Sequence, residues 1–308
     1  MGTPDFAVES LDAIVKAGYE VAAVVTVPDR QSGRGLKTIP SPVKMYAVEH
    51  GLPLLQPEKL RDPLFLEELA KTGADIFVVV AFRMLPQAVW AMPRLGTFNL
   101  HASLLPQYRG AAPINWAVIN GEKETGVTTF LLNEHIDEGR ILLQRSTPIT
   151  LDDNAGTVHD RLAAMGAELV VQTLDGLFSG SIQPSAQPTI DLLKPAPKIF
   201  KQDCAIDWHK KGQSIVDFVR GLSPYPAATA TMTDEKGNPI TIKIYETCHE
   251  PSENQGVGTL ITDRKKVLKI GVRDGFLHIL SLQMSGKKRI SIEEFLRGYN
   301  PTDWKLVI

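Results

Sequence analysis

Short apolar runs that alternate with helical stretches are the feature that most constrains how this chain can fold. Residues 20–26 and 75–81 are mostly apolar at successive positions, and residues 97–101 form a further β-type run around Phe98 and Leu100. We interpret all three as strands buried on both faces. Apolar residues within 8–15 recur at helical spacing, and Gly18 follows where that helix would end. The alternation predicts an α/β domain with an open, doubly wound, mostly parallel, Rossmann-like sheet. In such sheets, ligands bind at the carboxyl ends of the strands.

The same alternation continues through the first half of the chain. Residues 127–132 and 141–149 are further β-type runs, and residues 157–177 again have helical spacing. Residues 181–203 then contain four prolines among polar residues, which indicates a linker. We therefore expect one domain over residues 1–180, followed by this linker.

A second, smaller domain is predicted over residues 204–308. A helical stretch after Trp208 ends at Pro224. Five short β-type runs then follow between residues 228 and 282, separated by turn residues such as Asp274 and Gly275. Short strands with this punctuation predict a small OB-like β-barrel.

Composition excludes several classes of protein. The chain has 308 residues and a net charge of −2, and no run approaches the roughly 18–20 apolar residues of a membrane helix. Its start lacks the basic and apolar regions of a secretory signal. Cys204 and Cys248 are isolated in the sequence, so we expect two reduced thiols in a cytoplasmic protein that has no metal site. A slight excess of basic residues over 201–308 is compatible with a polyanionic partner.

A candidate catalytic set lies at the end of the strand over residues 97–101. Asn99 and His101 are two positions apart, so their side chains leave the strand on the same face, and Asp137 follows on a glycine-bounded turn. An amide donor, a base and a carboxylate that orients the base suit acyl transfer. A histidine alone at a strand end is more often structural, but the three residues together favour catalysis. No serine or cysteine with an evident base accompanies them, which favours direct transfer.

Longer motifs around these residues resemble a known family. The run over residues 99–106, with Asp137 downstream, resembles the signature of the formyltetrahydrofolate-dependent formyltransferases. Its continuation over residues 107–114 is similar to the members that act on methionyl-tRNA. The resemblance extends over essentially the whole chain, through residues 2–6, 29–35, 41–44, 206–208 and 224–226.

The resemblance implies a reaction and a set of binding residues. A formyl group would move from 10-formyltetrahydrofolate, as co-substrate, to the α-amino group of methionine on initiator tRNA. Asn99 and His101 would polarise the formyl carbonyl and manage the proton, and Asp137 would orient His101. The folate would bind along three loops, through Phe82, Arg83, Met84, Leu85, Ser103, Leu104, Leu105, Pro106, Asn133, Glu134 and Ile136.

Two basic regions are candidates for contact with tRNA. The loop over residues 29–44 is cationic and rich in glycine and proline, so we expect it to be mobile and able to follow a nucleic-acid backbone. The resemblance places Arg34 where the initiator tRNA is recognised. Short basic clusters also occur on the predicted barrel, where cationic faces commonly bind nucleic acid. The candidates are Arg30, Arg34, Lys37, Lys44, Arg264, Lys265, Lys266, Lys287, Lys288 and Arg289.

The start of the chain departs from the family pattern. The family has a strand before the loop that begins at Gly2, whereas Met1 directly precedes Gly2 here. We expect the sheet to lack this strand, at a cost of roughly several kcal/mol against a total stability of about 5–15 kcal/mol. The natural chain is then expected to begin further upstream, and the catalytic set to be unaffected.

Other functions remain open at this point. A formyltransferase for an amino-sugar nucleotide shares much of the expected architecture, and an enzyme for a purine-pathway ribonucleotide would end near the linker. An RNA-binding protein without activity would not need Asn99, His101 and Asp137. A dehydrogenase would need a Gly-x-Gly-x-x-Gly turn, which the segment Gly33-Arg34-Gly35 does not supply. We expect an enzyme that acts on tRNA as a monomer, without a membrane partner.

Overall fold

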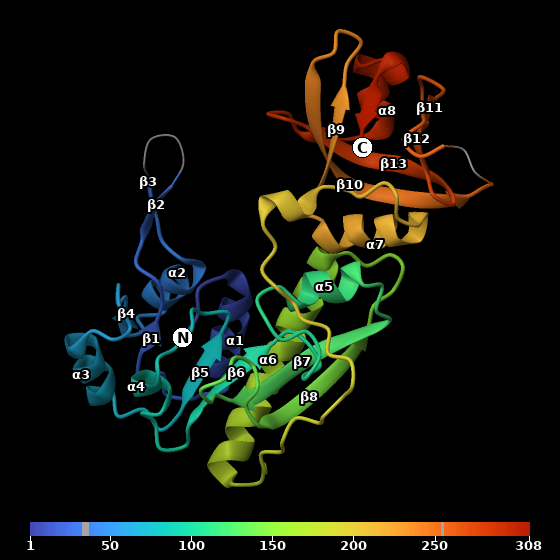
Figure 1. Ribbon diagram of the computed structural model, residues 1–308. Coiled ribbons are helices and arrows are strands. Elements are labelled where there is room, and N and C mark those ends of the chain that lie inside the picture. The colour runs from blue at the N-terminus through green and yellow to red at the C-terminus, as the bar shows by residue number, and fades with distance from the viewer. Residues whose placement is uncertain (33–36, 254–255) are drawn as a thin grey trace. The chain divides into compact units, whose positions relative to one another are not determined.

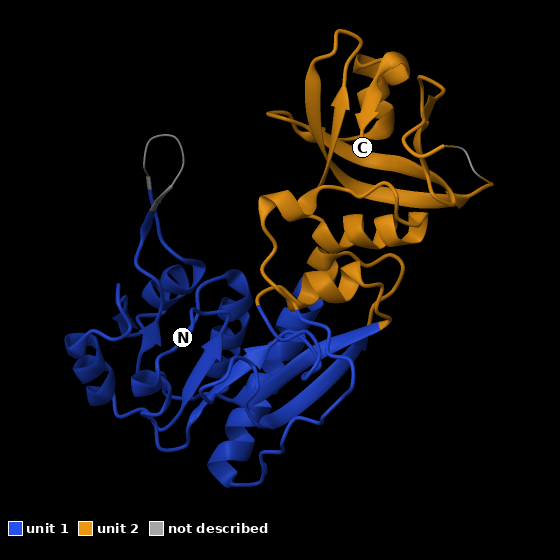
Figure 2. Cartoon of the chain, viewed as in Figure 1, with its two compact units in different colours: residues 1–110, 124–147, 159–195 blue, residues 111–123, 148–158, 196–308 orange. Residues whose placement is uncertain are grey.

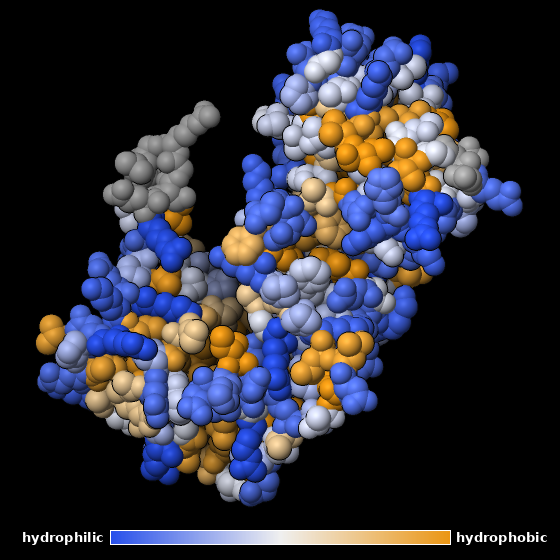
Figure 3. Space-filling model, viewed as in Figure 1, coloured by the Kyte–Doolittle hydropathy of each residue, from blue (hydrophilic) through white to orange (hydrophobic). Residues whose placement is uncertain are grey.

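The computed structural model describes residues 1–32, 37–253 and 256–308, which form two compact units (Figures 1 and 2). The first unit comprises residues 1–110, 124–147 and 159–195, and the second comprises residues 111–123, 148–158 and 196–308. No helix in the described part of the chain is both long and apolar enough to cross a bilayer. Polar residues cover much of the face shown in Figure 3, with apolar residues gathered in patches on each unit.

A four-stranded sheet forms the centre of the first unit. Its order is β5 (Phe77–Val80), β6 (Thr97–His101), β7 (Glu124–Leu131) and β8 (Ile141–Pro148). Strands β5 and β6 are parallel, whereas β7 runs antiparallel to β6. A separate parallel pair joins β1 (Val24–Val25) to β4 (Leu54–Leu55). The parallel pairs confirm the predicted fold class, and the antiparallel β7 departs from a purely parallel arrangement.

Met1 and Gly2 lie between β1 and β5, where the sequence comparison with the family expects a strand. Gly2 forms a parallel bridge with Val80, and its amide donates to the carbonyl oxygen of Val25 at 3.1 Å. The amide of Val80 donates in turn to the carbonyl oxygen of Met1 at 2.9 Å. Two residues therefore supply the hydrogen bonds that connect the two parallel pairs.

Helices cover both faces of this sheet, as the alternating pattern predicts. The long helix α6 (Ala155–Ser179) packs on the face of Leu100, because a Cβ on Gly166 would lie 2.7 Å from the Leu100 side chain. The opposite face carries Phe77 and Val79, which form a core cluster with residues from α3 and α4. The helices of this unit are α1 (Asp5–Lys16), α2 (Pro42–Glu49), α3 (Pro63–Lys71), α4 (Gln87–Trp90) and α6.

The second unit contains an antiparallel sheet that curls into a nearly closed barrel. Strand β10 is long and has register shifts at Glu246, which bend it. The core of the unit is apolar and includes Ile244, Ile270 and Leu277. Its strands are β9 (Ala228–Thr233), β10 (Pro239–Pro251), β11 (Leu260–Thr262), β12 (Leu268–Val272), β13 (Gly275–Met284), β14 (Arg289–Ser291) and β15 (Lys305–Val307). Its helices are α5 (Pro113–Ile119), α7 (Gly212–Leu222) and α8 (Ile292–Gly298).

The boundaries of the two units differ from the predicted domain boundaries, which lie at residues 180 and 203. Helix α5 precedes β7 in the chain but packs against α7 in the second unit. The buried guanidinium of Arg220 on α7 donates to the carbonyl oxygens of Thr150 and Asp153, at 2.9 and 3.0 Å. Both contacts join residues that are far apart in the sequence, so two segments of the first half belong to the second unit. Residues 181–195 of the expected linker belong to the first unit.

Candidate active site

His101 ends β6 and is almost fully buried, with 6% of its surface exposed. Its Nε2 lies 2.8 Å from the carbonyl oxygen of Tyr108. A carbonyl oxygen can only accept a hydrogen bond, so Nε2 carries the proton and Nδ1 of the neutral ring has the free electron pair. The carbonyl of Tyr108 is fixed in turn, because the Tyr108 amide donates to the carbonyl oxygen of Lys194 at 2.7 Å.

Asp137 lies on the turn between β7 and β8, at a positive φ of 55°. Its Oδ2 accepts a hydrogen bond from the amide of Gly110 at 2.9 Å and lies 3.9 Å from Nδ1 of His101. That separation is too long for a hydrogen bond. The orienting contact expected from Asp137 is therefore made by Tyr108, and the Asp137 carboxylate stands opposite the unprotonated nitrogen of the ring.

Asn99 projects from the middle of β6 on the same face as His101. Its side chain is partly exposed, and no hydrogen bond holds it within the described ranges of the chain. Thr97, two residues earlier on this face, donates from its hydroxyl to the carbonyl oxygen of Trp90 at 2.7 Å. The face of β6 that carries Asn99 and His101 is therefore the face covered by α4.

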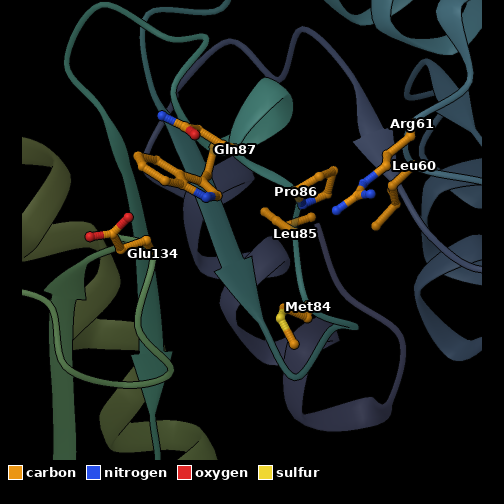
Figure 4. Close-up of a pocket in the computed structure, with 8 residues that line it drawn as sticks. Leu60, Arg61, Met84, Leu85, Pro86, Gln87 and Glu134 are labelled. Atoms are coloured by element: carbon orange, nitrogen blue, oxygen red, sulfur yellow. The ribbon is translucent and has the colours of Figure 1, made fainter.

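A cavity of about 420 Å³ opens beside α4 and is drawn in Figure 4. Met84 and Leu85 come from the loop after β5, and Glu134 comes from the turn after β7 (Figure 4). Asn99, His101 and Asp137 do not line this cavity. Trp90 lines it and accepts a hydrogen bond from Thr97, which lies on the same strand as Asn99 and His101. Sequence reasoning missed four of its residues, which carry no local motif: Leu60, Arg61, Gln87 and Trp90.

The residues expected to bind folate fall into two groups. Met84 and Ile136 are exposed, by 73% and 61%, and Glu134 lines the cavity with Met84. Phe82 and Leu85 belong with the core cluster under α3 and α4, and Leu104 is partly buried. The Asn133 side chain accepts a hydrogen bond from the amide of His135 at 2.9 Å.

The remaining folate candidates mainly hold the loops in place. Arg83 donates to the carbonyl oxygens of Pro57 and Glu58. The buried Ser103 hydroxyl donates to the carbonyl oxygen of Gln107 at 2.7 Å, and Leu105 packs in a core cluster ahead of Pro106. The side chains of Arg83, Ser103 and Leu105 therefore contact other parts of the protein, so a ligand here would contact the backbone of these loops.

The residues expected to bind tRNA are also of two kinds. Arg30 is exposed at the start of the hairpin formed by β2 (Arg30–Ser32) and β3 (Lys37–Ile39). Arg34 lies outside the described residues, and Lys37 begins β3. The expected mobile loop therefore contains a short antiparallel ladder. The ammonium of Lys44 is engaged, because it pairs with Asp29 at 2.6 Å.

The basic clusters of the barrel lie on exposed turns. Arg264, Lys265 and Lys266 form the turn between β11 and β12, and Lys287 and Lys288 form the turn between β13 and β14. Arg289 differs, since its guanidinium pairs with Glu246 at 2.5 Å and lies 4.7 Å from the centre of the Tyr245 ring.

The arrangement around His101 supports one kind of chemistry. Nδ1 of a neutral imidazole can accept a proton, and the nearby carboxylate stabilises the cation that results. The Asn99 amide can donate to an oxygen that becomes negative as a carbonyl is attacked. Within the described residues, no three His, Cys, Asp or Glu side chains gather as metal ligands.

Comparison with known proteins agrees with this chemistry. The model of the formyl transferase family matches residues 1–174, and the model of the formyl transferase C-terminal domain matches residues 198–300. The methionyl-tRNA formyltransferase of Parabacteroides distasonis is 57% identical over 305 residues, which cover 97% of this chain and 94% of the relative. That of Bacteroides thetaiotaomicron is 53% identical over 307 residues, which cover 98% of this chain and 95% of the relative.

Solved structures share the fold at lower identity. An N-formyltransferase from Helicobacter canadensis, in complex with folinic acid and dTDP-3-aminofucose, superposes with a TM-score of 0.66 at 21% identity. The match covers 94% of this chain and 97% of that one. HypX from Aquifex aeolicus in complex with tetrahydrofolic acid superposes with a TM-score of 0.56 at 20% identity, over 84% of this chain and 47% of that one. The family models and the two relatives together establish that this chain belongs to the formyl transferase family.

Proposed function

We propose that this enzyme transfers the formyl group of 10-formyltetrahydrofolate to the α-amino group of methionine on initiator methionyl-tRNA. The likeness to methionyl-tRNA formyltransferases at 53% and 57% identity, over nearly the whole of both chains, supports this assignment most directly. The presence of Asn99 and His101 on one face of β6, with Asp137 on the turn opposite His101, supports the same chemistry.

The proposed reaction forms one C–N bond and breaks another. The methionine nitrogen attacks the formyl carbon, and Nδ1 of His101 accepts the proton that this nitrogen loses. Asn99 donates to the carbonyl oxygen as it becomes negative, and the carboxylate of Asp137 stabilises the imidazolium. His101 then returns its proton to the N10 atom of the folate as the bond from that nitrogen to the formyl carbon breaks.

The cavity beside α4 is the proposed site of the folate ring system. A flat heterocycle needs apolar walls and a few polar groups that fix its orientation. Met84 and Trp90 provide the apolar walls, and the carboxylate of Glu134 can accept from the amino groups of a pterin. The guanidinium of Arg61 on the rim suits the carboxylates of the glutamate tail. The backbone of residues 103–106, which follows His101 in the chain, would bind the part of the folate nearest to His101.

The tRNA is proposed to contact the exposed basic residues. Arg30, at the start of the hairpin, and Arg34 would contact the acceptor end, and Lys265, Lys266 and Lys287 on the barrel turns would contact phosphates. Lys44 and Arg289 are weaker candidates, because each is paired with a carboxylate. Because charged tRNA is used in the cytoplasm, the enzyme is proposed to work there. We also propose that it acts as a monomer.

Acceptor specificity tests the proposal. The enzyme is supplied with 10-formyltetrahydrofolate and, in parallel, with initiator methionyl-tRNA, free methionine and a dTDP-linked amino sugar. We expect formylation of the charged tRNA alone. Formylation of the amino sugar alone would keep the roles of His101 and Asn99 but replace tRNA as the acceptor, and formylation of no acceptor would refute the proposed function.

A further inference from the structure

Residues 181–195, which the sequence presents as a linker, lie against both loops that surround the catalytic candidates. Ser185 joins the edge of the sheet, where it exchanges two backbone hydrogen bonds with Ile141, at 2.8 and 2.9 Å. Further along, Lys194 accepts the hydrogen bond from the amide of Tyr108 that fixes the partner of His101. This segment is therefore built into the first unit beside its site.

Gln187 makes the most extensive contacts of the segment. Its Nε2 donates to the carbonyl oxygens of Asp137 and Gly139, at 2.7 and 2.9 Å. Its Oε1 accepts from the Nε and Nη2 atoms of Arg109, at 3.2 and 2.7 Å. One amide thus joins the turn of Asp137 to the loop that follows β6.

Two other contacts complete the connection between the turn and the loop. Nη1 of Arg109 donates to Oε1 of Glu138 at 2.8 Å. The amide of Gly110, the next residue, donates to Oδ2 of Asp137 at 2.9 Å. Gln187 and Arg109 therefore join the turn that carries the Asp137 carboxylate to the loop that follows β6.

The turn of Asp137 needs such support because its backbone is strained. Asp137 has a φ of 55°, which is uncommon for a residue with a side chain. Gly139 is constrained by space instead, since a Cβ there would lie 1.6 Å from the carbonyl oxygen of Leu131. Strained backbone persists when surrounding contacts over-determine it, and Gln187 binds the carbonyl on each side of Glu138.

We propose that Gln187 is a positioning residue for formyl transfer, which holds the carboxylate of Asp137 at its distance from Nδ1 of His101. This inference rests on the proposed function of the site. An amide is required at this position, because it donates two hydrogen bonds from its nitrogen and accepts from a guanidinium with its oxygen. Glutamate would keep the acceptor for Arg109 but could not donate to the two carbonyls.

The test compares Gln187→Glu and Gln187→Met with wild type and with Gln183→Met. Methionine has nearly the size of glutamine without its hydrogen bonds, and Gln183 is an exposed glutamine four residues earlier on the same segment. We expect kcat for formylation of initiator methionyl-tRNA to fall roughly 10- to 100-fold in both Gln187 variants, since small misplacements of catalytic groups have effects of this size. KM for the tRNA and for the folate should stay within about twofold, because Gln187 does not line the cavity.

A second measurement separates positioning from stability and from the proposed function itself. The amide of Gly110, whose partner is the Asp137 carboxylate, should exchange its hydrogen faster in Gln187→Met than in wild type or Gln183→Met. Wild-type kcat in both Gln187 variants, or a fall in thermal stability alone, would overturn the inference and leave the function standing. Absence of formyl transfer by wild type would refute the proposed function. In that case the exchange rate of the Gly110 amide still tests the positioning role, and an equal rate in wild type and Gln187→Met would refute it.

Discussion

Nε2 of His101 lies 2.8 Å from the carbonyl oxygen of Tyr108, and this contact fixes which nitrogen of the ring can act as a base. Because the carbonyl requires a donor, Nδ1 is the nitrogen that can accept a proton. Asp137 lies 3.9 Å from Nδ1, beyond hydrogen-bond distance, so its carboxylate stands opposite the unprotonated nitrogen. We therefore propose an electrostatic role for Asp137, while the hydrogen bond to the Tyr108 carbonyl orients the ring.

Replacing Asp137 by asparagine should separate these two roles. Asparagine can still accept the hydrogen bond from Gly110, so the turn should keep its conformation. The loss of the negative charge should lower kcat roughly 100-fold, because the imidazolium is no longer stabilised. Steady-state kinetics of tRNA formylation, with thermal unfolding as the control for folding, checks this. An unchanged kcat would contradict the role given to the carboxylate.

The buried ion pair on α7 should contribute strongly to the stability of the second unit. Arg220 pairs with Asp217 at 2.7 Å, and both side chains are nearly buried. Arg220→Met leaves the Asp217 charge without its partner, so we expect a loss of about 3–5 kcal/mol in the free energy of unfolding. Arg145→Met removes an exposed pair with Glu168 and should cost at most about 1 kcal/mol. Urea denaturation of both variants checks this, and equal losses would contradict the burial argument.

The turn after β11 should respond to acid through Asp263. Three backbone amides, those of Lys266, Val267 and Lys265, donate to this carboxylate and lower its pKa from 3.8 to about 2. The folded-state pKa lies below the unfolded one, so the contribution to stability is complete above pH 3.8 and is lost as the pH falls toward 2. The stability advantage of wild type over Asp263→Asn should therefore shrink across that window. An advantage that is constant with pH would be inconsistent with this assignment.

The basic turns of the barrel should contribute to the salt dependence of tRNA binding. Alanine at Lys265, Lys266, Lys287 and Lys288 should weaken binding and reduce the slope of log K against log salt by roughly 0.7–0.9 for each phosphate contact removed. The control for the loss of two of these four charges is alanine at Lys16 and Lys71, which form exposed ion pairs within their own helices. Filter binding over a salt series measures both slopes. Equal slopes in wild type and the fourfold variant would exclude these turns from the interface.

The sequence predicted elements with strong local periodicity and missed those defined by contacts at long range. Helix α6 and strand β6 lie close to their predicted bounds, 157–177 and 97–101, because their patterns are regular. Helices α2 and α3 were not predicted, although Ser41 and Asp62 cap them and a proline follows each cap. The direction of β7 could not be predicted, because a strand's apolar pattern is the same in either direction.

The candidate site was predictable in its residue types but not in its geometry. Asn99, His101 and Asp137 stand out by their spacing and motif, whereas the Tyr108 carbonyl is a backbone group that no side-chain pattern indicates. Gln187 lies in a proline-rich segment, and only the fold places it beside Asp137.

The most direct test of this account measures N-formylmethionine released from initiator methionyl-tRNA after incubation with 10-formyltetrahydrofolate. Wild type and His101→Asn are compared in the same experiment, with thermal unfolding to confirm that both are folded. We predict formylmethionine from wild type and a rate at least roughly 100-fold lower from the variant, because Nδ1 no longer accepts the proton. Equal rates from the two proteins, or no formylmethionine from wild type, would contradict the account.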